Sequence, residues 1–128
     1  MRNKIIAFIS LFFISFQALS QCASNEVEIS VVITTDNYPL ETSWQLVDQN
    51  GGTFFISPGD LNQTNTTYTY TYCVPDTNCY VFTISDTWGD GICCGYGNGS
   101  YSVLVDGNTI ASGGSFQSSE TSYNIGGC

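Results

Sequence analysis

The chain has 128 residues, of which only 10% are charged, and it contains no histidine. Its two cations, Arg2 and Lys4, lie at the N-terminus, and all eleven acids come later. The missing imidazole excludes a Ser-His-Asp or Cys-His centre, and the missing cations exclude a phosphate site or a nucleic-acid surface. What remains is carboxylate chemistry, metal binding, aromatic stacking or a structural role.

Residues 1–20 have the three parts of a secretory signal peptide: a charged start, an apolar run at 5–16 and small residues at 18–20. The apolar run is shorter than a membrane span. An alternative is a lipoprotein signal, in which Cys22 would carry the lipid. Both patterns predict an exported protein, extracellular or at the cell surface, with a single domain at 21–128.

After the signal segment, apolar and polar residues alternate without any helical pattern. Val27, Ile29, Val31 and Ile33 share one face of the first predicted strand. The same alternation predicts further strands at 42–48, 54–57, 66–72, 80–84, 101–105, 109–111 and 120–125. A hairpin signal, Asp-Gly, precedes the strand at 109–111. So many short strands predict an all-β fold, a jelly-roll-like sandwich of two antiparallel sheets stabilised by disulfides.

An even number of cysteines in a small exported domain predicts disulfides. The six are Cys22, Cys73, Cys79, Cys93, Cys94 and Cys128. The sequence leaves their pairing open: Cys73 and Cys79 flank a turn and could close a local loop. The adjacent Cys93 and Cys94 bond each other or, as is more common, pair elsewhere. Cys22 and Cys128 could join the two ends of the domain or link one subunit to the next.

The segment 85–100 has the composition of a cation-binding loop. Asp86 and Asp90 are separated by a turn that contains glycine, which could bring both carboxylates to one point. The glycines of the segment permit backbone conformations that direct carbonyl groups inward, and calcium takes carboxylate and carbonyl oxygens as ligands. The spacing is not that of an EF-hand, so the alternative is a disulfide-tied loop whose acids are merely solvated.

Two strings, TDNYPLETSW at 35–44 and DTWGDGICC at 86–94, resemble a secreted β-sandwich module found in extracellular proteins of Bacteroidetes-type bacteria and microalgae. The strings YGNGSY at 96–101 and ASGGSF at 111–116 continue the resemblance, which covers nearly all of residues 27–125. The resemblance implies a β-sandwich in an extracellular protein, and it leaves the role of the module poorly defined.

The resemblance also pairs the segment of Asp36 and Glu41 with the segment of Asp86 and Asp90, because these are its two motif-bearing loops. If both loops lie at one end of the sandwich, the four carboxylates converge. We therefore expect a Ca²⁺ site formed by Asp36, Glu41, Asp86 and Asp90.

Aromatic residues lie in or beside the same loops. We expect Trp88, Tyr96 and Tyr38 to be the candidates for stacking on sugar rings, next to the calcium. Trp44 alternates with Leu46 and is expected in the core. A row of tyrosines at 68, 70 and 72 forms one sheet face, and the sequence does not determine whether this face is buried.

Three Asn-x-Ser/Thr sequences predict N-glycosylation in a eukaryotic secretory pathway, at Asn62, Asn65 and Asn98.

An enzyme would have to use a pair of carboxylates, such as Asp86 and Asp90, in the manner of a glycosidase. The chain is small for a catalytic cleft, so we expect no enzyme. We expect a secreted structural or adhesive protein that associates with itself into an extracellular assembly or filament, because its strands carry little charge and its first strand suits addition to a sheet edge. The alternative is a calcium-dependent carbohydrate-binding module.

Overall fold

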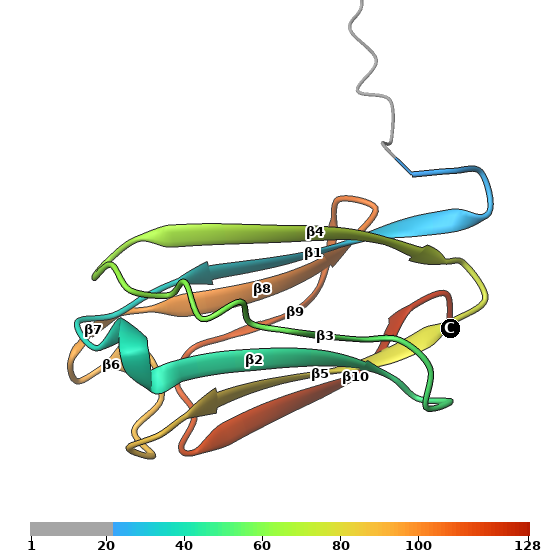
Figure 1. Cartoon of the computed structure of the whole chain (residues 1–128). Helices are drawn as coiled ribbons and strands as arrows, with labels where there is room; N and C mark the ends of the chain where they lie inside the picture. Colours follow the sequence, from blue (N-terminus) through green and yellow to red (C-terminus); the bar gives the residue numbers. More distant parts are fainter. Residues whose placement is uncertain (1–21) are drawn as a thin grey trace, which may run out of the picture.

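A computed structural model describes residues 22–128, and the expected signal peptide at 1–20 lies outside the described residues. Two four-stranded antiparallel sheets pack face to face, and a two-stranded ribbon lies at one end (Figure 1). This confirms the predicted class, a two-sheet antiparallel β-sandwich stabilised by disulfides. Within 22–128, no helix is long and apolar enough to cross a membrane.

The two sheets have the strand orders β4-β1-β8-β9 and β10-β5-β2-β3. The strands of the first sheet are β1 (Glu26–Thr34), β4 (Thr67–Pro75), β8 (Ser100–Val105) and β9 (Asn108–Gly113). Those of the second are β2 (Thr42–Asp48), β3 (Phe54–Ile56), β5 (Cys79–Asp86) and β10 (Ser119–Gly126). The remaining elements are the short 3-10 helix η1 (Pro39–Glu41) and the ribbon strands β6 (Cys93–Cys94) and β7 (Gly97–Asn98).

The strands form where the sequence alternates, because alternate side chains of a strand point to opposite faces. Ile29, Val31 and Ile33 of β1 and the inward residues of β5 are fully or almost fully buried, and together with inward residues of β2, β8 and β10 they form most of the core. The hairpin between β8 and β9 turns at Asp106 and Gly107, which both have positive φ (47° and 79°). A type I′ turn requires this conformation, so the hairpin prediction is confirmed.

The tyrosine row of β4 faces the core and is half-buried. Tyr70 and Tyr72 pack on Trp44 of the opposite sheet, with ring centroids 5.1 and 6.2 Å apart. Phe55 of β3 stacks on Tyr72 at 4.1 Å. The row therefore belongs to the contact between the two sheets, and Trp44 is a buried core residue as expected.

The disulfides join Cys22 to Cys73, Cys79 to Cys128 and Cys93 to Cys94. The predicted alternative of a local disulfide between Cys73 and Cys79 is therefore wrong, because each of these cysteines pairs with a residue near one terminus. Cys22 and Cys128 are not bonded to each other, and neither has a free thiol for a second subunit or for a lipid. The adjacent cysteines bond each other, which was the less common of the two alternatives. Such disulfides are compatible with a secreted protein.

The two long-range disulfides lie at the same end of the sandwich, which we call the disulfide end. Cys22 and Cys73 lie where β1 begins and β4 ends, and Cys79 and Cys128 lie where β5 begins and β10 ends. The opposite end, which we call the loop end, carries η1, β6 and β7 with the segments 35–41 and 87–99 (Figure 1).

Candidate functional site

The structure brings the two motif-bearing segments together at the loop end. The amide of Asn37 donates a hydrogen bond to the carbonyl of Tyr96 (3.0 Å), and the amide of Thr87 donates to the carbonyl of Glu41 (3.0 Å). Ile92 is fully buried in the core, and its amide donates to the carbonyl of Gly114 (3.0 Å). The long segment between β5 and β8 is therefore fixed to the sandwich along its length.

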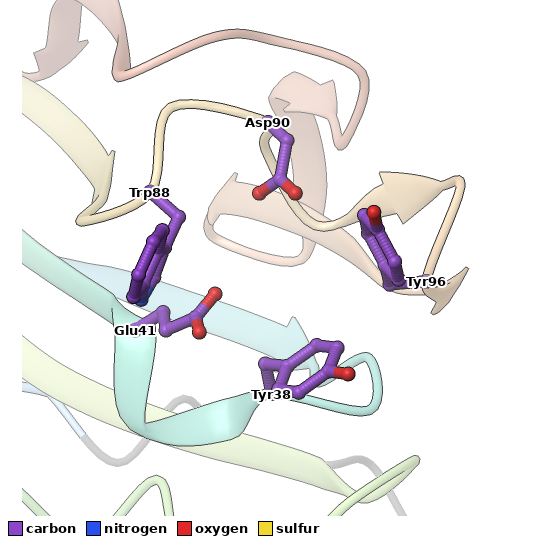
Figure 2. Close-up of a pocket in the computed structure, with 5 residues that line it drawn as sticks. All are labelled: Tyr38, Glu41, Trp88, Asp90 and Tyr96. Carbon is purple, nitrogen blue, oxygen red and sulfur yellow. The ribbon is translucent and has the colours of Figure 1, made fainter.

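Asp86 organises the turn that follows β5. Its side chain is only 5% exposed, and its Oδ1 accepts the backbone amides of Trp88 (2.9 Å), Gly89 (2.7 Å) and Asp90 (3.4 Å). Gly91 continues the turn with φ of +68°, a conformation that other residues rarely adopt. A Cβ at this position would collide with the carbonyl oxygen of Phe116. This local geometry leaves Trp88 in solvent and directs Asp90 back towards Glu41 (Figure 2).

Three of the four expected metal ligands form one cluster. Glu41, Asp86 and Asp90 each place a carboxylate oxygen within 4.8 Å of the other two. Asp36 is not a member of this cluster: it is buried, and its Oδ1 accepts the amide of Tyr38 (2.8 Å). In the described part of the chain one other group has metal-ligand spacing, at Cys22, Glu26 and Cys73, but its two sulfurs form a disulfide.

Negative charge accumulates in this region, because residues 22–128 contain no lysine, arginine or histidine to offset it. Partial removal from water raises the pKa of Glu41, and repulsion by Asp86, Asp90 and Asp36 raises it further. Burial raises the pKa of Asp36; the hydrogen bond from Tyr38 opposes this rise, and the charges of Asp86 and Asp90 add to it. The loop end thus favours a bound cation or proton.

The three expected sugar-stacking residues surround a single pocket. Tyr38, Trp88 and Tyr96 are 49%, 78% and 55% exposed, and with Glu41 and Asp90 they line a hollow of about 250 Å³. Figure 2 shows Glu41 and Tyr38 approaching from one segment and Trp88, Asp90 and Tyr96 from the other. The rings of Tyr38 and Tyr96 meet edge to face with centroids 5.6 Å apart. The pocket therefore combines aromatic faces with two carboxylates.

A second hollow of about 250 Å³ adjoins the first and shares Tyr38 and Glu41 with it. Its other walls include Asn37, Leu40 and Asn62, and Leu40 is among the most exposed apolar side chains of the described residues. The sequence did not single out Asn37 or Leu40, because their role depends on the path of η1. Together the two hollows are lined by aromatic, amide and carboxylate groups.

Thr42, another residue that sequence reasoning missed, lies behind the carboxylate cluster. It is 7% exposed, and its Oγ1 is buried without any hydrogen-bond partner among the described residues. Thr42 pairs directly with Asp86 in the register of β2 and β5, and both side chains point into the sandwich. No described residue donates to Oδ2 of Asp86, whose three hydrogen bonds all reach Oδ1.

The three predicted glycosylation sites, Asn62, Asn65 and Asn98, are all exposed. Asn65 donates through Nδ2 to Oδ1 of Asn37 (3.2 Å), so this site lies near the loop end. Asn62 lines the second hollow. A glycan on Asn62 would therefore cover part of the surface described above.

No protein-family model, curated protein or solved structure matches the chain. The site is therefore interpreted from its own residues and geometry. The function is accordingly inferred from the loop end. Its distinguishing property is an acidic pocket with an aromatic rim at one end of a disulfide-tied sandwich.

Proposed function

We propose that this chain is a non-enzymatic carbohydrate-binding module that acts outside the cell, and that it binds its ligand at the pocket of the loop end. The observation that carries the proposal is the convergence of Tyr38, Trp88 and Tyr96 with two carboxylates around one hollow (Figure 2). Residues from two segments far apart in sequence contribute to it, and three solvent-facing aromatic rings in one place typically mark a binding surface.

The chemistry of the pocket suits a polyhydroxylated ligand. The apolar face of a sugar ring stacks on an aromatic face such as that of Trp88, while ionised Glu41 and Asp90 accept hydrogen bonds from hydroxyl groups. Acidic sugars are disfavoured, because the surrounding carboxylates would repel them. The expected ligand is therefore a neutral or amine-bearing glycan.

The size of the surface supports an oligosaccharide. One hollow of about 250 Å³ is smaller than the roughly 300–1,000 Å³ of pockets that enclose drug-sized ligands. The adjoining hollow around Leu40 and Asn62 extends the same surface. We expect one ring to bind between Trp88 and Tyr96, and a neighbouring ring to reach beyond Tyr38.

The position of Asp86 argues against the glycosidase pair Asp86 and Asp90 that the sequence offered. A glycosidase places two carboxyl groups on opposite sides of the bond that it cleaves. Asp86 and Asp90 belong to one turn, and Asp86 lies behind the pocket rather than in its lining. The pair thus does not flank a bound sugar.

A glycan array probed with the oxidised protein tests the proposal. We expect retention of a defined set of neutral or amine-bearing glycans, and a loss of affinity of about 30-fold in Trp88→Ala, because truncation of an aromatic anchor costs about 2 kcal/mol. Tyr123→Ala is the matched control, since Tyr123 is 65% exposed on β10 and lies outside the pocket. Equal retention by the two variants, or no retention by the unmodified protein, would contradict the proposal.

Self-association is the second candidate, and the edges of the first sheet favour it. The edge strands β4 and β9 contain no charged residue, although charged side chains are a common protection against edge-to-edge pairing. Negative-stain electron microscopy of the oxidised protein tests this candidate. Regular fibres would support a structural subunit, and dispersed small particles at high concentration would contradict it.

A further inference from the structure

We propose that Glu41, Asp86 and Asp90, together with the hydroxyl of Thr42, bind one calcium ion at the base of the pocket. The evidence for ion binding comes from the geometry of these four residues and does not depend on the proposed function. Its role in recognising a sugar rests on the proposed function.

The spacing of the carboxylates fits a single ion. Oxygen ligands lie about 2.3–2.6 Å from Ca²⁺, so two ligands on opposite sides of the ion are about 5 Å apart. The three carboxylate oxygens all lie within 4.8 Å of one another, and one ion can therefore contact all three. The fixed turn at Asp86 and the hydrogen bond from Thr87 to the carbonyl of Glu41 hold the two contributing segments in this arrangement.

The buried hydroxyl of Thr42 is an independent observation that points to a ligand. A buried polar group without a hydrogen-bond partner costs about 1–3 kcal/mol, so such groups are rare. Thr42 Oγ1 has no hydrogen-bond partner among residues 22–128. Thr42 lies directly opposite Asp86, and such residues of an antiparallel pair have Cβ atoms about 4.5–5.5 Å apart. Oδ2 of Asp86 also lacks a donor within residues 22–128. A cation between these oxygens would satisfy both.

The charge of the site requires a partner of opposite sign. Three carboxylates lie close together, one of them buried, and the described chain offers no cationic side chain. Like charges at this separation repel one another strongly where water is partly excluded. A divalent cation offsets most of this repulsion.

The ligand set selects calcium among common cations. The described residues provide oxygen donors but no imidazole, and every cysteine in 22–128 is disulfide-bonded, so the soft ligands that zinc favours are missing. Magnesium requires a near-ideal octahedron and gives up its waters reluctantly, whereas calcium accepts irregular sets of six to eight oxygens. Glu41 and Asp90 line the pocket, so the remaining coordination positions of the ion would face it and could take sugar hydroxyls.

Isothermal titration with calcium chloride, on oxidised protein freed of metal by a chelator, tests the site without any glycan. We expect about one ion per chain with a Kd near 0.1–1 mM, the range of extracellular calcium modules. Asp86→Asn should weaken binding at least 30-fold. Asp76→Asn, which removes the same charge from an exposed residue outside the cluster, should bind as the unmodified protein does.

Thr42→Val tests the hydroxyl separately, because valine keeps the shape of threonine and removes only the oxygen. We expect a several-fold weaker calcium affinity, with a melting temperature in chelator that is equal to or above that of the unmodified protein. Calcium should raise the melting temperature of the unmodified protein and of Asp76→Asn, and should leave that of Asp86→Asn unchanged. The melting curve in chelator also shows that each variant is folded.

The outcomes separate the two proposals. Absence of binding at 10 mM calcium, about ten times the weakest expected Kd, or equal affinities of Asp86→Asn and Asp76→Asn, would overturn the calcium site. Calcium binding without retention of any glycan would support the site and contradict the proposed function. Glycan retention that persists unchanged in chelator would overturn the role of the ion in sugar recognition.

Discussion

The two ends of the sandwich each bury one aspartate at the end of a strand, and they satisfy it differently. At the disulfide end, Oδ1 of Asp48 accepts the amide of Asn50 (2.8 Å) and Oδ2 accepts Nδ2 of Asn78 (2.9 Å). At the loop end, Oδ1 is the only oxygen of Asp86 that accepts from a donor in the described part of the chain, and two further carboxylates lie beside it. Both oxygens of Asp48 accept hydrogen bonds, whereas Oδ2 of Asp86 accepts none from residues 22–128.

The disulfides of the two ends also differ, in how strongly they constrain the chain. The disulfide end has two bridges, whose partners are 51 and 49 residues apart, and the bridge at the loop end joins adjacent residues. Long loops lose much conformational freedom when they are closed, and a link between neighbours closes almost none. The comparison therefore assigns covalent stabilisation chiefly to the disulfide end, and it leaves the loop end, where we propose that ligands bind, with little of it.

The largest expected effect is the loss of a long-range disulfide. Replacing both Cys79 and Cys128 by Ala should lower the free energy of unfolding by about 4 kcal/mol, because the closed loop of 49 residues constrains the unfolded chain. Replacing both Cys93 and Cys94 should cost clearly less. Guanidinium denaturation followed by fluorescence measures the free energy of unfolding of both variants. Equal decreases would show that the disulfides of the two ends stabilise the protein equally.

A glycine of the loop end should give the next largest effect. Gly91→Ala should cost about 3 kcal/mol, because alanine tolerates positive φ poorly and its Cβ would collide with the carbonyl of Phe116. Gly59→Ala is the control: its φ is also positive (+76°) but nothing lies within 4 Å, so about 1 kcal/mol is expected. Equal shifts in thermal unfolding would show that the loop yields to the added methyl group.

Asp48 and Asp86, the buried aspartates that end β2 and β5, provide a direct comparison. Asp48→Asn should cost about 1–3 kcal/mol, since the new amide cannot accept from both Asn50 and Asn78. Asp86→Asn in chelator should change stability by less than about 1 kcal/mol, because relief of repulsion offsets weaker hydrogen bonds to the turn amides. Differential scanning calorimetry in chelator measures both. A large loss in Asp86→Asn would mean that its carboxylate is needed chiefly for the fold.

The smallest effect concerns Tyr101, whose hydroxyl donates to Oε2 of Glu120 (2.7 Å). Burial and this hydrogen bond raise the pKa of Tyr101 to about 12. The neutral phenol therefore stabilises the fold fully below the ordinary pKa of 10.0, and this contribution is lost as the pH rises through about 12. Glu120→Gln should lower the pKa of Tyr101 in an alkaline titration of phenolate absorbance. An unchanged titration would show that burial alone sets the value.

Much of the fold was predictable because alternation is a local signal. The inward rows of β1 and β5 follow directly from it, and the hairpin at Asp106 follows from turn chemistry. The disulfide pairing was not predictable, since it depends on which strand ends meet. The short ribbon of β6 and β7 was also missed, because two-residue strands leave no periodic pattern.

The candidate site was predictable as a set of residues but not as a geometry. The motif strings brought Glu41, Asp86 and Asp90 together, and these do form one cluster. They could not show that Asp36 stays outside this cluster and accepts a backbone amide. Nor could they single out Thr42, whose position opposite Asp86 exists only in the register of two strands.

The arrangement of the long-range disulfides also determines how the protein responds to tension. A pull between Cys22 and Cys128 crosses the first disulfide to Cys73, follows the chain to Cys79 and leaves through the second disulfide. Only the segment 73–79 lies on this path, and six residue steps extend by at most about 20 Å. Apart from the last residues of β4 and the first residue of β5, the strands lie outside the path, and so does the loop end. The oxidised protein should therefore behave as a short, nearly inextensible link under force, with its pocket kept intact.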